Sequence, residues 1–242
     1  MGCLFCFQLS LAVFIMVCDN IYEVIYMQFI YRRGVEPDYA NVTKLIVTDE
    51  VLDEGFFTDI LPRFARLESL IINTDVKWRW LKNADLARLK MLYLTTDGVP
   101  TFPLKCDNLA VLSIVVKSEM EDYSREELYA IDRRRYDFSH LKNLTFLRIS
   151  GWYSLDYRSF APLSNLRELV INDRGSDDLS WLSESYSLSA LTFSGNLISL
   201  SGIETQPELE YLHLAGNFIS DVSPLDKLTK LKEVDLKGNP LK

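Results

Sequence analysis

Two nearly identical phrases close the chain, and their spacing limits its fold more than any other feature. Leu209–Asn217 reads L-x-x-L-x-L-x-G-N and Leu231–Asn239 reads L-x-x-V-x-L-x-G-N, an offset of 22 residues. A unit of this size is too short to bury its own apolar face, so recurring units must stack on one another to share a core. The fold class therefore depends on how far upstream the phrase extends.

The three apolar positions of the phrase can be followed through most of the chain. Upstream copies place them at Val42, Leu45 and Val47; Leu67, Leu70 and Ile72; Leu89, Leu92 and Leu94; Leu109, Leu112 and Ile114; Leu144, Leu147 and Ile149; Leu166, Leu169 and Ile171; and Leu188, Leu191 and Phe193. The steps measure 20 to 25 residues, apart from one gap of 35. With the two closing copies, this makes nine repeats over residues 42–242.

Each repeat combines two periodicities. The phrase itself alternates apolar and other residues, which predicts a short strand. Between copies, apolar residues recur about every three positions, as at Ile219, Val222, Leu225 and Leu228. That spacing predicts a return limb of 3₁₀-helix or short helix.

This pattern resembles the leucine-rich repeat family, and is most similar to its 22-residue class, which includes internalins and a regulatory subunit of protein phosphatase 1. The resemblance covers about four-fifths of the chain. It implies an α/β solenoid, a curved array with a parallel β-sheet on the concave side and 3₁₀ or short helices on the convex side. It also implies a non-enzymatic module that binds proteins.

Asparagines mark the end of the strand in the last repeats. We expect Asn196, Asn217 and Asn239 to bond to backbone groups that the turn leaves without partners. Upstream copies place Glu50, Asp75 and Asp97 there, which can partly substitute, or Lys117, Trp152 and Arg174, which cannot do so in the same way. The middle coils are therefore expected to be less regular than the last three.

The N-terminal region has three alternative interpretations. Residues 1–18 form a hydrophobic segment that fits a signal peptide, a membrane anchor or a buried cap. Membrane association would run through residues 1–30, although Asp19 and Glu23 interrupt that stretch. We expect residues 19–41 to form an N-terminal cap, with a capping strand or helix over residues 21–31. The location therefore stays open between membrane-associated or exported, which is slightly favoured, and cytoplasmic.

The 35-residue gap contains a charged insertion at residues 117–137. Ser124 and Glu127 match the S-x-x-E signature of a helix start, which predicts a short helix near residues 125–134. The insertion is either a solvated decoration or a flap that contacts a partner, since insertions in repeat arrays often lie on the binding side.

The sequence ends directly after the ninth phrase. Leu231, Val234 and Leu236 are then expected to face water. Three explanations stay open: the natural chain continues, this edge pairs with something, or the reading frame is truncated and without a selected function.

Composition and motifs argue against nucleic-acid binding and against enzymatic activity. The net charge of −8 disfavours nucleic acid as a partner, because phosphate binding needs a basic surface. No phosphate loop, nucleophile elbow or zinc-protease motif is present, so we expect no catalytic residues, no cofactor and no metal. The chain is predicted not to be an enzyme.

The remaining candidate is the outer face of the strands. The residues flanking the fourth position of each phrase, and the one after its last apolar residue, should point away from the core; in the second copy these are Ser69, Ile71 and Asn73. Apolar, aromatic and arginine residues there are typical interface anchors. The predicted partner-binding residues are Ile71, Met91, Tyr93, Val115, Phe146, Arg148, Tyr211 and His213. The partner is a protein, and the alternative is a surface-displayed or membrane-anchored adhesin or receptor-like ectodomain.

Overall fold

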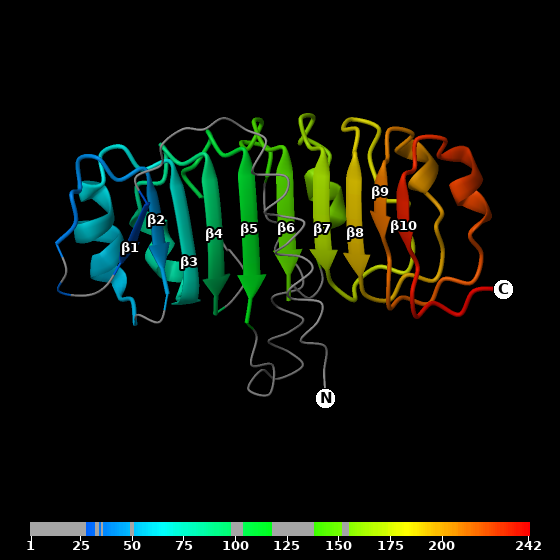
Figure 1. Ribbon diagram of the computed structural model, residues 1–242, viewed down its shortest axis with the longest axis horizontal. Helices are drawn as coiled ribbons and strands as arrows, with labels where there is room; N and C mark the ends of the chain where they lie inside the picture. The colour runs from blue at the N-terminus through cyan, green and yellow to red at the C-terminus, as the bar shows by residue number, and fades with distance from the viewer. Residues whose placement is uncertain are drawn as a thin grey trace.

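Ten parallel strands form one open sheet in which chain order and spatial order are the same (Figure 1). The computed structural model describes residues 28–31, 34, 36–48, 51–97, 104–117, 138–151 and 155–242. The strands are β1 Gln28–Tyr31, β2 Lys44–Val47, β3 Ser69–Val76, β4 Met91–Thr96, β5 Val111–Val116, β6 Phe146–Ser150, β7 Glu168–Asn172, β8 Ala190–Ser194, β9 Tyr211–His213 and β10 Glu233–Asp235. Since every neighbour is the next strand in sequence, each strand and its return limb make one coil of a solenoid. The predicted fold is confirmed.

Strand β1 precedes the nine repeats found in the sequence. It pairs in parallel with β2, with Ile30 opposite Ile46. It lies within residues 21–31, where a capping strand or helix is predicted. Most of the segment 1–18 and the cap 19–41 falls outside the described residues, so these domain boundaries stay predictions.

The return limbs carry short helices on the side away from the sheet's outer face. They are η1 Phe56–Ile60, η2 Leu61–Arg63, η3 Trp78–Asn83, η5 Tyr157–Phe160, η6 Ile203–Thr205 and η7 Ser223–Lys227. All are 3₁₀ except η1, a single π turn. Proline occupies the first turn of η2 and η7, where its missing N–H leaves no bond unmade.

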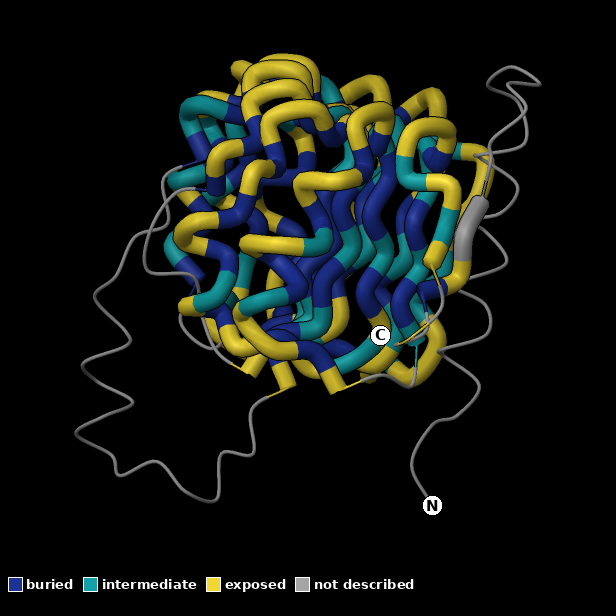
Figure 2. Tube along the Cα trace, turned by 90° about the vertical axis from the view of Figure 1, so that its left-hand side faces the viewer, coloured by how far each residue is buried: buried dark blue, intermediate teal, exposed yellow. Residues whose placement is uncertain are grey.

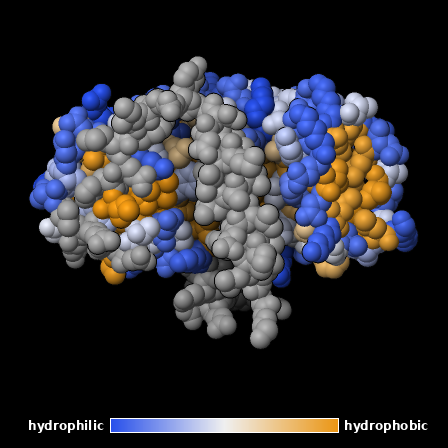
Figure 3. Space-filling model, in the orientation of Figure 1, coloured by the Kyte–Doolittle hydropathy of each residue, from blue (hydrophilic) through white to orange (hydrophobic). Residues whose placement is uncertain are grey.

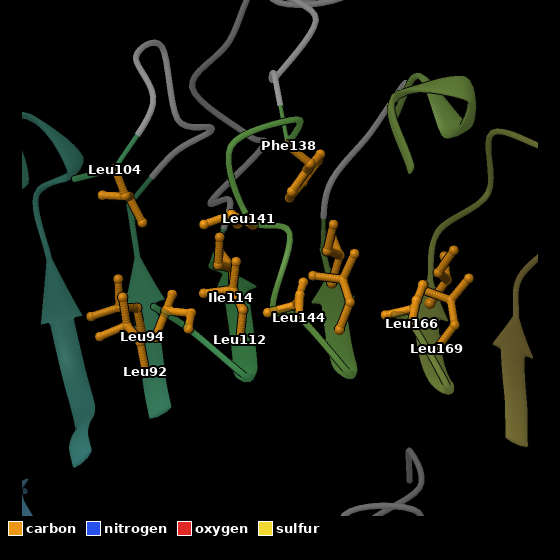
Figure 4. Packing of buried hydrophobic residues seen from close by; sticks show 14 of the residues in the cluster. Leu92, Leu94, Leu104, Leu112, Ile114, Phe138, Leu141, Leu144, Leu166 and Leu169 are labelled. Atoms are coloured by element: carbon orange, nitrogen blue, oxygen red, sulfur yellow. The ribbon is translucent and has the colours of Figure 1, made fainter. Parts of the chain in front are cut away.

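The core fills the space between sheet and limbs. Side chains such as Leu92 and Leu112 point into it from adjacent strands, and Phe138 reaches it from a limb (Figure 4). Along the stack, buried residues line the inside of the coils and exposed residues lie on the turns (Figure 2). Each such side chain stabilises the fold by roughly 1.5–3 kcal/mol relative to an exposed one, so stability is spread along the whole array.

Asn217 and Asn239 link adjacent coils at the end of the strand, as predicted. Asn217 is buried; its Oδ1 accepts from the N–H groups of Gly195 and Leu197 at 3.0 and 3.2 Å. Its Nδ2 donates to the carbonyls of Phe193 and Leu214 at 2.8 and 2.9 Å. Asn239 repeats the pattern one coil later.

Asn196 also bonds to a backbone group of the neighbouring coil, but with fewer bonds. Its side chain is half-buried, and its Nδ2 donates to the carbonyl of Arg174, at 3.1 Å. Gly195, immediately before it, lies at the coil-to-coil contact: a Cβ there would lie 1.8 Å from the carbonyl oxygen of Asp173. That position therefore requires glycine.

A second ladder, which the sequence reading missed, joins the coils at the strand entrance. Asn108, Asn143 and Asn165 each stand immediately before the first leucine of their repeat. Their Nδ2 atoms donate to carbonyl oxygens of the preceding coil, Ala87, Asp107 and Lys142, at 2.8, 3.3 and 2.8 Å. The sequence signal for this ladder was the asparagine that precedes the first leucine in three consecutive repeats. In the last coils an ion pair takes its place, with Lys230 Nζ 2.6 Å from Glu208 Oε2.

The interruption leaves the sheet intact. Residues 118–137 lie outside the described part of the chain, and with them the predicted helix at 125–134. The flanking strands β5 and β6 nevertheless pair in register, Val111 opposite Phe146. Lys117, at the start of the insertion, pairs with Asp75 at 2.8 Å.

At the last coil, Val234 is 41% exposed, and Leu231 and Leu236 are partly buried. Within the described ranges, no helix combines the length and the hydrophobicity needed to cross a bilayer.

Candidate partner-binding face

The side chains that point away from the core form rows across the sheet, which we call the concave face. The strand register aligns the central row as Ile30, Ile46, Ile71, Tyr93, Ser113, Arg148, Val170, Thr192, His213 and Asp235. The first row is Lys44, Ser69, Met91, Val111, Phe146, Glu168, Ala190, Tyr211 and Glu233.

The third row starts irregularly. A register shift in β3 between Ile72 and Asp75 puts Asp75, not Asn73, opposite Thr95. Asn73 is therefore wrong as the third-row residue of this repeat. The row continues through Val115, Ser150, Asn172 and Ser194.

Five of the eight predicted residues gather on the three adjacent strands β4–β6. Met91 and Phe146 flank Val111 in the first row, Tyr93 and Arg148 flank Ser113 in the central row, and Val115 lies in the third. All five are half-buried. Ile71 extends this group onto β3. The structure thus brings six predicted residues into one contiguous set.

Arg148 has the most perturbed surroundings of the set. Partial burial of its guanidinium is the main effect and lowers the pKa of Arg148, while the nearby Tyr93 hydroxyl acts to raise it. The residue between them, Ser113, is only 4% exposed. The small Ser113 side chain leaves room for the Tyr93 and Arg148 side chains on either side. An aromatic ring and a cation therefore lie close together on the face.

Tyr211 and His213 form a separate group three strands away, on β9. Tyr211 is exposed, and the Nζ of Lys232 lies 5.9 Å from its ring centroid. The Nε2 of His213 lies 3.8 Å from Glu233 Oε1. Each of these two residues thus lies close to a charged side chain of β10 or its entry turn.

Glu168, which the sequence reading did not select, stands next to Phe146 in the first row. Partial burial raises the pKa of its carboxyl. Among the described residues, no group of histidine, cysteine and acidic side chains could hold a metal ion. What the face presents is apolar and aromatic surface with single charges at fixed places, which suits recognition of another molecule.

Comparison with known proteins agrees with this architecture. A family model described as "Leucine Rich repeats (2 copies)" matches residues 207–242. No curated protein sequence matches the chain. TLR13, solved in complex with ssRNA13, is similar at a TM-score of 0.55 and 16% identity over 84% of this chain and 34% of that chain. The functional domain of InlJ from Listeria monocytogenes is similar at a TM-score of 0.52 and 17% identity, over 84% and 41%.

An internalin C2 from Listeria monocytogenes matches at 24% identity with a TM-score of 0.46, over 73% of this chain and 74% of that chain. The chain spans 62% of the internalin InlF from the same organism, with which it shares 16% identity at a TM-score of 0.45 over 83% of its own length. The matches to TLR13 and InlJ, with TM-scores above 0.5, show similarity of fold, a solenoid of leucine-rich coils.

Proposed function

We propose, from the premise that this chain is a leucine-rich repeat protein, that it is a non-enzymatic module that binds a protein partner through its concave face. The observation that carries the proposal is the contiguous set on β3–β6: Ile71, Met91, Tyr93, Val115, Phe146 and Arg148. Leucine-rich repeat proteins are generally scaffolds without enzymatic activity, which supports a binding role.

Energetics favour this set as the anchor region. Protein interfaces concentrate their binding energy in a few aromatic and arginine residues near the centre of the contact. Phe146, Tyr93 and Arg148 provide these types on neighbouring strands, at the middle of a ten-stranded sheet. Their half-buried state holds the side chains in place, which lowers the entropy cost of binding.

The test is a matched pair of double variants. Tyr93→Ala with Phe146→Ala removes the aromatic anchors, and Ile198→Ala with Phe218→Ala removes two exposed apolar side chains that lie outside the strands, 59% and 57% exposed. The tagged proteins are incubated with extract of the source cells, and co-purifying proteins are quantified. We expect the first pair to lose the partners of the wild type and the second to keep them.

Two results would contradict the proposal. Equal loss in both variants would place the contact elsewhere or show unspecific adhesion. Loss of the cooperative thermal transition in the Tyr93/Phe146 variant would show that these side chains belong to the core rather than to the binding face.

The adhesin or receptor-like form of this function differs in compartment rather than in contacts. Intact-mass measurement of the protein from soluble and membrane fractions separates the two. A mass that lacks roughly the first 18 residues, or that carries an acyl group, supports export or anchoring. A soluble, full-length and unmodified mass contradicts it.

A further inference from the structure

The N-terminal part of the concave face carries an unbroken apolar row. Ile30, Ile46, Ile71 and Tyr93 follow one another in the central row, one side chain from each of β1 to β4. Ile30 is 48% exposed, and Ile46 and Ile71 are half-buried. Figure 3 shows an apolar patch over β1–β3, at the left of the molecule.

The other end of the same row has a different chemistry. From β7 to β10 it reads Val170, Thr192, His213 and Asp235, with Tyr211 and Glu233 beside the last two. Within the central row, apolar side chains on consecutive strands therefore occur at β1–β4, while the first row has its own apolar run, Met91, Val111 and Phe146, on β4–β6.

The spacing of the row selects the kind of partner. Adjacent strands lie about 4.8 Å apart, so the four side chains recur at that interval across the sheet. An α-helix advances about 5.4 Å per turn and presents one side chain per turn along a stripe. An extended strand laid in the same direction presents side chains to one face about every 6.7 Å. A helix thus matches the row more closely over its length than a strand does.

The charged residues near the row indicate where a bound helix would carry charges of its own. Lys44 lies in the first row on β2, two residues before Ile46, and Arg148 lies in the central row two strands beyond Tyr93. Lys44 therefore flanks the apolar row at its second strand, and Arg148 lies beyond its β4 end. An acidic residue beside the apolar stripe of a helix, and another at the end of the helix that lies toward β6, would complement these two cations, in the manner that sets register at interfaces.

From this geometry we infer that the apolar row on β1–β4 is a docking site for an amphipathic helix of the partner, laid across the strands, with apolar residues one turn apart and acidic residues beside the apolar stripe and at the end toward β6. The inference rests on the proposed function and deepens it, because it names the part of the concave face and the chemistry of what it binds.

The test uses three fluorescein-labelled 18-residue peptides. The first is a cross-linked helix with leucines at positions i, i+4, i+7 and i+11, and with glutamates beside that stripe and at one end. The second is the same cross-linked helix with those leucines redistributed so that no stripe forms. The third has the composition of the first, with leucines at alternate positions and two prolines that prevent a helix. Binding to the full chain is followed by fluorescence anisotropy.

Two protein variants locate the site. Ile46→Thr with Ile71→Thr keeps β-branched side chains in the strands but removes apolar surface from the row. Val170→Thr makes the same kind of change in the same row on β7 and is the matched control. We expect the striped helix to bind at least ~10-fold tighter than either other peptide, and the double variant to weaken it by at least ~10-fold, with Val170→Thr unchanged.

The other outcomes overturn the inference. Equal binding of the striped and redistributed helices, tighter binding of the extended peptide, or no binding at all would each refute a helix site. Binding that falls with Phe146→Ala but not with the isoleucine changes would refute the row and keep the concave face as the binding face. A thermal transition of the double variant close to that of the wild type ensures that lost binding is not lost folding.

Discussion

The coils that contain β5 to β7 and those that contain β9 and β10 satisfy the backbone between coils in two different ways. Stacked coils need bonds between their non-strand segments, where no sheet ladder satisfies the backbone. The later coils place Asn217 and Asn239 at the strand exit, buried or half-buried and with several bonds each. The earlier ones place Asn108, Asn143 and Asn165 at the strand entrance, exposed and with one bond each.

The coil of β7 adds a third device at its exit. The carboxylate of Asp173 is 4% exposed and accepts from the hydroxyl of Tyr157 at 2.6 Å and from the N–H groups of Arg174 and Gly175. The ring of Tyr157 stacks on Trp181 at 4.6 Å. The buried carboxylate of Asp173 and the phenol of Tyr157 therefore link the turn to the return limb. The later coils use the side-chain amides of Asn217 and Asn239 at the same place.

The largest expected effect comes from the exit amide. Asn217→Ala removes four bonds and leaves buried backbone groups of two coils without partners, so we expect a loss of at least ~3 kcal/mol in the free energy of unfolding. Urea denaturation followed by circular dichroism measures it. Asn196→Ala is the control one coil earlier; a comparable loss there would erase the contrast between a buried and a half-buried amide.

The Tyr157 contact should come next. Tyr157→Phe keeps the ring on Trp181 but removes one of the donors to a buried carboxylate, for which we expect a loss of about 2 kcal/mol. The same denaturation experiment measures it. No change in stability would mean that backbone donors alone satisfy Asp173.

The same carboxylate predicts a pH dependence. Burial raises the pKa of Asp173 above its ordinary value of 3.8, against hydrogen bonds that lower it. Since the folded pKa is the higher one, the folded state binds the proton more tightly. The contribution of this group is therefore greatest below pH ~4 and falls as the pH rises through its folded pKa.

Asp173→Asn should remove that part of the dependence. The unfolding free energies of both proteins are measured from pH 4 to pH 7. Their slopes against pH should differ at the lower end of this range and become equal at the upper end, where Asp173 is deprotonated in both the folded and the unfolded state. Glu168, whose pKa burial also raises, is present in both proteins and cancels from the difference. An identical slope in the two proteins throughout would contradict the assignment to Asp173.

The entrance amides should matter less. Asn165→Ala removes one exposed bond to the carbonyl of Lys142, and water can replace the lost donor, so we expect about 1 kcal/mol or less. Thermal unfolding of Asn165→Ala beside Asn217→Ala gives the ratio directly. A loss as large as that of Asn217→Ala would show that both ladders carry equal weight.

The smallest effect belongs to the ion pair of the last coils. Lys230→Gln removes a surface contact with Glu208 whose side chains are 53% and 51% exposed. Such pairs contribute roughly 0–1 kcal/mol and weaken with salt. Unfolding at low and high ionic strength should show a small difference that disappears at 1 M salt.

The sequence predicted the periodic part of this molecule well. Alternation within the phrase places Leu169 and Ile171 in the core and Val170 outside, because strand geometry leaves no other choice. What it could not place were contacts set by coil-to-coil distance. The step from Leu188 to Leu209 is 21 residues rather than 22. Asn196 lies in this shorter repeat and makes one side-chain bond to the backbone where Asn217 makes four.

The candidate site shows the same division. The outward residues followed from periodicity, but their grouping did not. Tyr211 and His213 looked equivalent to Tyr93 and Arg148 in the sequence, although two strands, β7 and β8, separate β6 from β9. The pairing of Tyr157 with Asp173 depends on the path of the return limb, for which the repeat pattern gives only a spacing of apolar residues.

The in-register pairing of β5 with β6 has a consequence for how such a chain can change. The sheet depends on where each phrase begins and not on how many residues precede it: Val111 meets Phe146 across 35 residues just as Phe146 meets Glu168 across 22. The interrupted limb and the recognition surface are thus separate units of variation. Evolution, or a protein engineer, can lengthen or replace the former while the latter keeps its geometry.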